Sequence, residues 1–113
     1  MAGRLEGKVA AITGAASGFG AGTTRRFIEE GGKVVMGDIQ DDAGQALADE
    51  LGDAAVYVHC DVTVEDEVAN MVDTAVSHFG QLDIMYNNAG VVGAVGPMRR
   101  LLQRSGSARW IFT

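Results

Sequence analysis

The sequence is poor in proline, cysteine and aromatic residues, and each shortage narrows what the chain can be. Among 113 residues there is one proline and one cysteine, and aromatic side chains make up 6%. Cys60 has no partner for an internal disulfide and no CxxC spacing for a metal or redox site, so we expect a buried, inert thiol. No run approaches the roughly 20 apolar residues of a membrane span, and the first residues lack the apolar core of a signal peptide. A cytoplasmic location without a membrane anchor is the expectation.

Acidic residues are missing from one part of the chain. The net charge is −6 at pH 7, yet all 15 acidic residues precede Val91, and the segment 98–113 is purely basic. An acidic chain lacks the basic face that general nucleic-acid binding needs. His59 and His78 have no plausible nucleophile or metal set beside them. We therefore assign no metal site, and no role to either histidine.

What the sequence does contain is a regular alternation of apolar runs and amphipathic segments, punctuated by many of its 16 glycines. Continuous apolar runs are typical of parallel strands buried on both faces, and four are present, at residues 8–13, 33–38, 54–58 and 82–87. Helical spacing follows each of the first three runs, beginning with residues 20–30. Asp41 and Asp42 are the expected caps of the second helix, and Thr63 is the expected cap of the third.

The order βαβαβαβ with short loops predicts an α/β fold, a Rossmann-type doubly wound parallel sheet of about four strands and three helices. The first strand is expected at the centre, with the second and third on one side and the fourth on the other. The first two helices are expected on one face and the third on the other. The fourth strand would then present a bare edge, which invites pairing with another chain.

The strongest functional signal is the stretch VAAITGAASGFG at residues 9–20. Gly14, Gly18 and Gly20 lie between a predicted strand and a predicted helix, where little side chain would separate a phosphate from the N–H groups of the helix start. A plain tight turn is the alternative. There is no Gly-Lys-Ser/Thr, so the turn is not a nucleoside-triphosphate P-loop. The spacing predicts a pyrophosphate-binding turn.

Two aspartates that follow predicted strands extend this site. Asp38 lies 18 residues after Gly20, where a carboxylate can accept both ribose hydroxyls of an adenosine and would repel a 2′-phosphate; this predicts NAD over NADP. The alternative is a surface aspartate that starts a turn. Asp61 is expected either to bind the adenine amino group, with Val62 beside the ring, or to be a loop residue near Thr63.

Two motifs, one after the first predicted strand and one after the fourth, resemble those of one enzyme family. Residues 13–20, TGAASGFG, are similar to the TGxxxGxG turn of the short-chain dehydrogenases/reductases, and Asn87-Asn88-Ala89-Gly90 is similar to their NNAG motif. The chain from residue 4 to 92 resembles NAD-preferring plant members of the secoisolariciresinol, xanthoxin and momilactone dehydrogenase type. The resemblance implies hydride transfer between NAD and a secondary alcohol or ketone. It also implies a set of cofactor-binding residues: Gly14, Ser17, Gly18, Phe19, Gly20, Asp38, Ile39, Asp61, Val62, Asn88, Ala89 and Gly90.

The resemblance covers residues 4–97 and then ends. Family members continue through a strand that ends in a catalytic Ser and a helix that carries Tyr-x-x-x-Lys. Neither Tyr57 nor Tyr86 has a lysine four residues later, and Lys33 is the last lysine of the chain. In this chemistry the Tyr transfers the hydroxyl proton and the Lys lowers its pKa. No catalytic residue is therefore assigned in this chain.

We accordingly expect residues 1–97 to form a truncated NAD-binding domain and residues 98–113 to form a divergent basic tail, disordered or a short helix at 98–104. A shifted reading frame, a retained intron, alternative splicing or an inaccurate gene model would produce such a tail. The expected partners are NAD and, for a full-length parent, a small alcohol or ketone; pairing with itself or with full-length relatives through the bare sheet edge is a further expectation. Two functions stay open, the cofactor-binding part of an alcohol dehydrogenase or ketone reductase, and a catalytically inactive nucleotide-binding stub.

Overall fold

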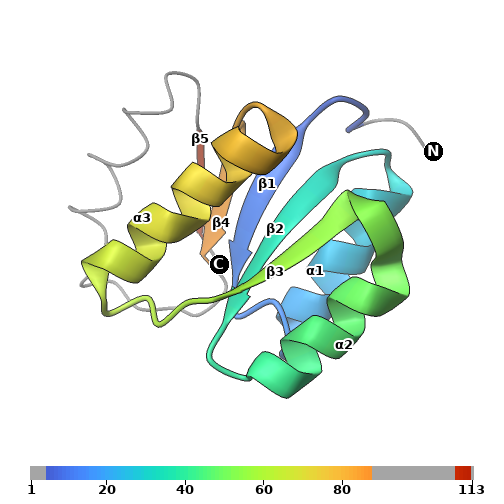
Figure 1. Cartoon of the computed structure of the whole chain (residues 1–113). Helices are drawn as coiled ribbons and strands as arrows, with labels where there is room; N and C mark the ends of the chain where they lie inside the picture. The colour runs from blue at the N-terminus through green and yellow to red at the C-terminus, as the bar shows by residue number, and fades with distance from the viewer. Residues whose placement is uncertain (1–4, 88–108, 113) are drawn as a thin grey trace.

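A computed structural model describes residues 5–87 and 109–112, and its frame is one parallel sheet (Figure 1). Five strands lie in the order β3-β2-β1-β4-β5. Their bounds are β1 Val9–Thr13, β2 Lys33–Asp38, β3 Ala55–His59, β4 Ile84–Asn87 and β5 Arg109–Phe112. All neighbouring strands are parallel, so their carboxyl ends meet at one end of the sheet.

Helices lie on both faces of this sheet. α1 (Gly18–Glu29) and α2 (Asp41–Leu51) lie on one face, and α3 (Glu65–Thr74) lies on the other (Figure 1). The short η1 (Gly52–Ala54) follows α2, and η2 (Ala75–Phe79) continues α3 with wider, π-helical turns. The connections run outward from β1 to β3 and then return to β4, on the other side of β1. The switch point of the sheet, where ligands bind in such folds, therefore lies between β1 and β4.

The core has two layers because β1 is buried on both of its faces. Val9 and Ala11 pack on the α3 side of the sheet, and Ala10 and Ile12 pack on the side of α1 and α2. Every residue of β1 is buried. Strands of this kind need apolar side chains at consecutive positions, which explains the continuous apolar runs of the sequence.

The expected fold class and strand order are confirmed, but the expected helix caps are wrong. α2 begins at Asp41 after Gln40, α3 begins after Val64, and neither has a side-chain cap hydrogen bond. The Asp41 carboxylate instead accepts a hydrogen bond from β3, and the Thr63 hydroxyl donates to Asp61 at 2.6 Å. The Asp41 carboxylate is thus engaged by a distant strand, and the Thr63 hydroxyl by its neighbour Asp61 in the same loop.

The outer side of β4 also differs from expectation. Arg109–Phe112, expected to be disordered or part of a short helical tail, pairs in parallel with β4. The strand satisfies the N–H and C=O groups that an edge strand leaves unpaired. β4 is therefore not a bare edge, and β5 is the outermost described strand on this side of the sheet. The expected pairing with another chain through a sheet edge stays a prediction. The short helix expected at residues 98–104 lies outside the described residues.

The described helices include no span long and apolar enough to cross a membrane. Within residues 5–87 and 109–112, no group of three or more His, Cys, Asp or Glu side chains is arranged to hold a metal ion. His78, one of the two histidines, lies in η2, where its ring meets the Phe79 ring edge-on at 4.7 Å between centroids.

Candidate nucleotide-binding site

The turn between β1 and α1 is held by Gly14 and Ser17. Gly14 has a φ of +63°, a left-handed conformation that favours glycine. Ser17 Oγ donates to the Gly14 carbonyl oxygen at 2.7 Å, and the Ser17 N–H donates to the same oxygen at 3.2 Å. Because its hydroxyl is turned to this carbonyl, Ser17 makes no side-chain cap bond to α1. The first N–H groups of α1 are thus left without a side-chain cap, the arrangement that lets a helix start bind an anion.

Gly18 and Gly20 serve different purposes. A Cβ on Gly20 would lie 1.9 Å from the Gly14 carbonyl oxygen, so glycine is required there for α1 to pack against the turn. A Cβ on Gly18 would meet no atom of the described residues within 4 Å, and Gly18 has no positive φ. Neither packing nor backbone conformation therefore requires glycine at this position. The described residues leave the space over Gly18 open.

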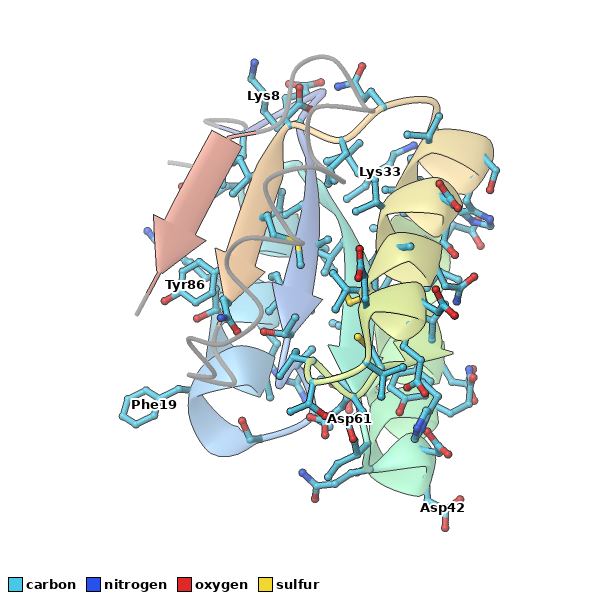
Figure 2. The ribbon with its side chains drawn as sticks, turned by 90° about the vertical axis from the view of Figure 1, so that its left-hand side faces the viewer. Lys8, Phe19, Lys33, Asp42, Asp61 and Tyr86 are labelled. Carbon is cyan, nitrogen blue, oxygen red and sulfur yellow. The ribbon has the colours of Figure 1, made fainter. Side chains whose placement is uncertain are left out.

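Two large apolar side chains are exposed at the same end of the sheet. Phe19 is 88% exposed and Ile39 is 62% exposed. Figure 2 shows Phe19 pointing away from the ribbon at the start of α1, at the end of the sheet where Asp61 lies.

Asp38 joins the glycine turn to the end of β2. Its Oδ2 accepts the N–H of Ala16 at 2.9 Å, and its Oδ1 accepts the N–H groups of Ile39 at 2.7 Å and Gln40 at 3.1 Å. The residue is only 5% exposed, and three backbone donors compensate the burial of its charge. Asp38 is therefore not a surface residue, although its bonds to Ile39 and Gln40 do begin a turn. Its contact with a ribose stays a prediction.

Asp61 and Val62 form the loop that leads from β3 to α3. Asp61 Oδ1 accepts the Thr63 N–H at 2.9 Å and the Thr63 hydroxyl at 2.6 Å, and these bonds lower the pKa of Asp61. The Asp61 N–H donates to Glu67 Oε1 at 2.8 Å. Val62 is only 6% exposed and packs in the α3-side core. The loop role of Asp61 is therefore established by its bonds, whereas its adenine contact stays a prediction.

Asn87 anchors the motif that follows β4. It is 1% exposed, and its Oδ1 accepts the Thr13 hydroxyl at 2.7 Å, which ties the end of β4 to the end of β1. The remaining predicted site residues of this motif, Asn88, Ala89 and Gly90, lie outside the described residues.

A polar cluster that the sequence did not reveal lies beside Asp38. The Tyr57 hydroxyl lies 2.6 Å from Asp41 Oδ1 and 2.7 Å from the Asp38 carbonyl oxygen. His59 Nδ1 lies 2.8 Å from the same Asp41 oxygen. Burial, followed by the hydrogen bond to Asp41, raises the pKa of Tyr57; the Asp41 bond also raises the pKa of His59. Hydrogen bonds from Tyr57 and then His59 lower the pKa of Asp41.

One sequence signal could have pointed to this cluster. Tyr57 and His59 are two residues apart in β3, so both side chains leave the same face of the strand. Gly44 makes room for the first of them, since a Cβ there would lie 2.1 Å from the Tyr57 ring. Only the fold brings Asp41 to that face.

The chain matches a family model described as short chain dehydrogenase over residues 8–109. Tropinone reductase-like 2 from Erythroxylum coca is 63% identical over 93 residues, which are 82% of this chain and 34% of that protein. Secoisolariciresinol dehydrogenase from Forsythia intermedia is 51% identical over 92 residues, which are 80% of this chain and 33% of that protein. The chain thus spans about a third of the length of these relatives.

The fold is also found among solved structures. A 3-ketoacyl-(acyl-carrier-protein) reductase from Brucella melitensis, solved in complex with NADH, matches with a TM-score of 0.79 and 37% identity. The match covers 89% of this chain and 50% of that one. The resemblance expected from residues 13–20 and from Asn87-Asn88-Ala89-Gly90 is confirmed by these matches. The chain belongs to the short-chain dehydrogenase family.

Proposed function

We propose that this chain binds NAD(H) across the carboxyl ends of β1 to β4, with the adenosine over β2 and β3. The pyrophosphate would lie over Gly18 at the uncapped start of α1, where N–H groups and the helix dipole attract an anion. The observation that carries this proposal is the space that the described residues leave open over Gly18 at the first position of α1, where neither packing nor backbone conformation explains the glycine. The NADH complex of the reductase from Brucella melitensis supports the choice of cofactor.

The adenosine would extend from this turn toward Asp38. A carboxylate offers about four lone-pair sites, and three backbone N–H groups already use Asp38. We expect the remaining site to accept one ribose hydroxyl, rather than both as expected from the sequence, and the negative charge to repel the 2′-phosphate of NADP. Ile39 on one side and the loop of Asp61 and Val62 on the other would hold the adenine, and Asn88, Ala89 and Gly90 would complete the site.

The activity we propose for the whole enzyme is hydride transfer between NAD and a secondary alcohol or ketone. The bound nicotinamide would accept or supply the hydride, and a proton must leave or reach the substrate oxygen at the same time. These 113 residues contain no Tyr-x-x-x-Lys to carry that proton. We therefore infer that they act as a cofactor-binding part and turn over no alcohol by themselves. The same sequence observation favours the second candidate, an inactive nucleotide-binding stub.

Calorimetric titration of the 113-residue chain with NAD and with NADP tests the proposal. We expect NAD to bind and NADP to bind more weakly. Equal affinity for the two would contradict the assigned role of Asp38, and no heat with either would contradict the whole proposal. Incubation with NAD and secondary alcohols, followed at the absorbance of NADH, should give no turnover. Measurable turnover would overturn the inference that these residues act only as a cofactor-binding part.

A further inference from the structure

We propose that His59 is a positioning residue that joins the two loops expected to hold the adenosine, and that its protonated form strengthens cofactor binding. The inference rests on the proposed NAD binding. It concerns how two chain segments, the one that follows β2 and the one that follows β3, are held relative to each other. In this proposal His59 acts through the two carboxylates that its ring contacts, Asp41 and Glu67.

The imidazole of His59 has a carboxylate at each of its nitrogens. Nδ1 lies 2.8 Å from Asp41 Oδ1, and Nε2 lies 3.4 Å from Glu67 Oε1. The same Glu67 oxygen accepts the N–H of Asp61 at 2.8 Å. The His59 ring thus connects Asp41, the first residue of α2, with Glu67 of α3, which holds the loop after β3. We call these contacts, from Asp41 through His59 to Glu67, the bridge.

The other end of the bridge leads to the loop after β2. Asp41 directly follows Ile39 and Gln40, whose N–H groups donate to Asp38. Tyr57 donates to the Asp41 oxygen that faces His59, so the Asp41 carboxylate is held from β3 at two points. The bridge therefore links Ile39 on one side with Asp61 on the other. These are the residues between which the adenine is proposed to lie.

The bridge depends on the charge of His59. Only the imidazolium carries the positive charge that attracts both carboxylates, through the hydrogen bond to Asp41 and the ion pair with Glu67. In a neutral ring that donates to Asp41, the lone pair of Nε2 would face the Glu67 carboxylate. The hydrogen bond to Asp41 raises the pKa of His59, and the charges of Asp41, Glu67 and Asp61 raise it further. The titratable groups that face the ring or lie beside it come from every neighbouring element: Asp38 at the end of β2, Asp41 from α2, Tyr57 from β3, Cys60 and Asp61 after β3, and Glu67 from α3.

The direction of the pH effect follows from that raised pKa. The bridge is complete below the ordinary histidine value of 6.5 and is lost as the pH rises through the higher pKa of the folded chain. Cofactor affinity should therefore fall as the solution becomes alkaline. The side chains of His59 and Asp41 are 49% and 59% exposed, so water screens the pair. We expect a change of about two- to fivefold in the dissociation constant.

Calorimetry with three ligands tests the positioning role. The dissociation constants of NAD, ADP-ribose and nicotinamide mononucleotide are measured at about pH 6 and about pH 9, on either side of the histidine titration. For the unchanged chain, NAD and ADP-ribose should weaken by about two- to fivefold between the two pH values. His59→Gln should bind both with the weaker affinity at either pH. His78→Gln, which changes the histidine of η2, should keep the full pH dependence. A His59→Gln chain that keeps it would overturn the proposal.

Nicotinamide mononucleotide separates the adenosine end from the other end of the cofactor. Because the bridge lies on the adenosine side, any affinity for this ligand should be the same in His59→Gln and in the unchanged chain. An equal loss for all three ligands would show a general effect on the fold and would overturn the positioning role.

An NMR titration of the ligand-free chain tests the bridge independently of NAD binding. The amide signals of Ile39 and Asp61 should both shift with the titration of His59. In Glu67→Gln the Asp61 amide should lose this response while the Ile39 amide keeps it. If neither amide signal shifts with the titration of His59, the bridge is contradicted, even if the chain binds NAD. A chain that binds no NAD at any pH overturns the proposed function even where both amides respond.

Discussion

The Asp38 carboxylate accepts a hydrogen bond from the Ala16 N–H at 2.9 Å, although 22 residues separate the two. This bond fastens the glycine turn to the end of β2. The other oxygen of Asp38 holds the N–H groups of Ile39 and Gln40. One side chain thus shapes both the proposed pyrophosphate turn and the loop beside the proposed adenosine. A substitution at Asp38 should therefore affect stability and cofactor choice together.

Asp38→Asn should lower the free energy of unfolding by about 1–3 kcal/mol, because the new NH₂ group would face a backbone N–H and leave a buried donor unpaired. Urea denaturation measures this change. Loss of the charge should also raise the affinity for NADP relative to NAD. Asp42→Asn, at an exposed aspartate of the first turn of α2, is the matched control and should stay within about 0.5 kcal/mol. If Asp38→Asn is as stable as that control, the stabilising role of the hydrogen bonds to Asp38 is contradicted.

Gly20→Ala should destabilise the chain because the added Cβ would lie 1.9 Å from a backbone carbonyl oxygen, which has little room to move. Overpacking of this kind costs about 1–3 kcal/mol. Gly22→Ala places the same Cβ in the same helix with no described atom within 4 Å, and should raise stability by up to about 1 kcal/mol. The midpoints of urea denaturation compare the two variants. Equal midpoints would be inconsistent with the close approach of α1 to the turn.

Cys60 should be unreactive in the folded chain. Burial raises the pKa of its thiol to about 12, so almost none of it is thiolate at neutral or mildly alkaline pH. Iodoacetamide at about pH 8 should label the native chain at least about 100-fold more slowly than the urea-unfolded chain. Mass spectrometry follows the labelling. Rates within a few-fold of each other would mean that the thiol is accessible and that this part of the α3-side core opens.

Much of the sheet could be predicted because its strands are buried on both faces. β2 was expected at residues 33–38 and is found at Lys33–Asp38, since an unbroken apolar run followed by an aspartate leaves few other structures. The third helical segment ends at Gly80, whose φ of +89° is the left-handed cap conformation that glycine favours, so its end too follows from a local signal. Local pattern decides such features.

Features that depend on distant contacts could not be predicted. Asp41 was expected as a helix cap, but Tyr57 and His59 bind it across the fold. β5 was missed because a four-residue strand in a basic segment becomes visible only beside β4. The bond between Asp38 and Ala16 likewise needs β1 and β2 side by side. The individual cofactor-binding assignments and the cytoplasmic location stay predictions.

The central claim is that the space over Gly18 holds the pyrophosphate of NAD. Calorimetric titration of Gly18→Ala against Gly22→Ala tests it most directly, since both changes add one methyl group to α1 and neither meets a described atom within 4 Å. The claim predicts that both variants fold, that Gly22→Ala binds NAD as the unchanged chain does, and that Gly18→Ala loses at least about tenfold in affinity, about 1.4 kcal/mol. Equal affinity of the two variants for NAD would contradict it.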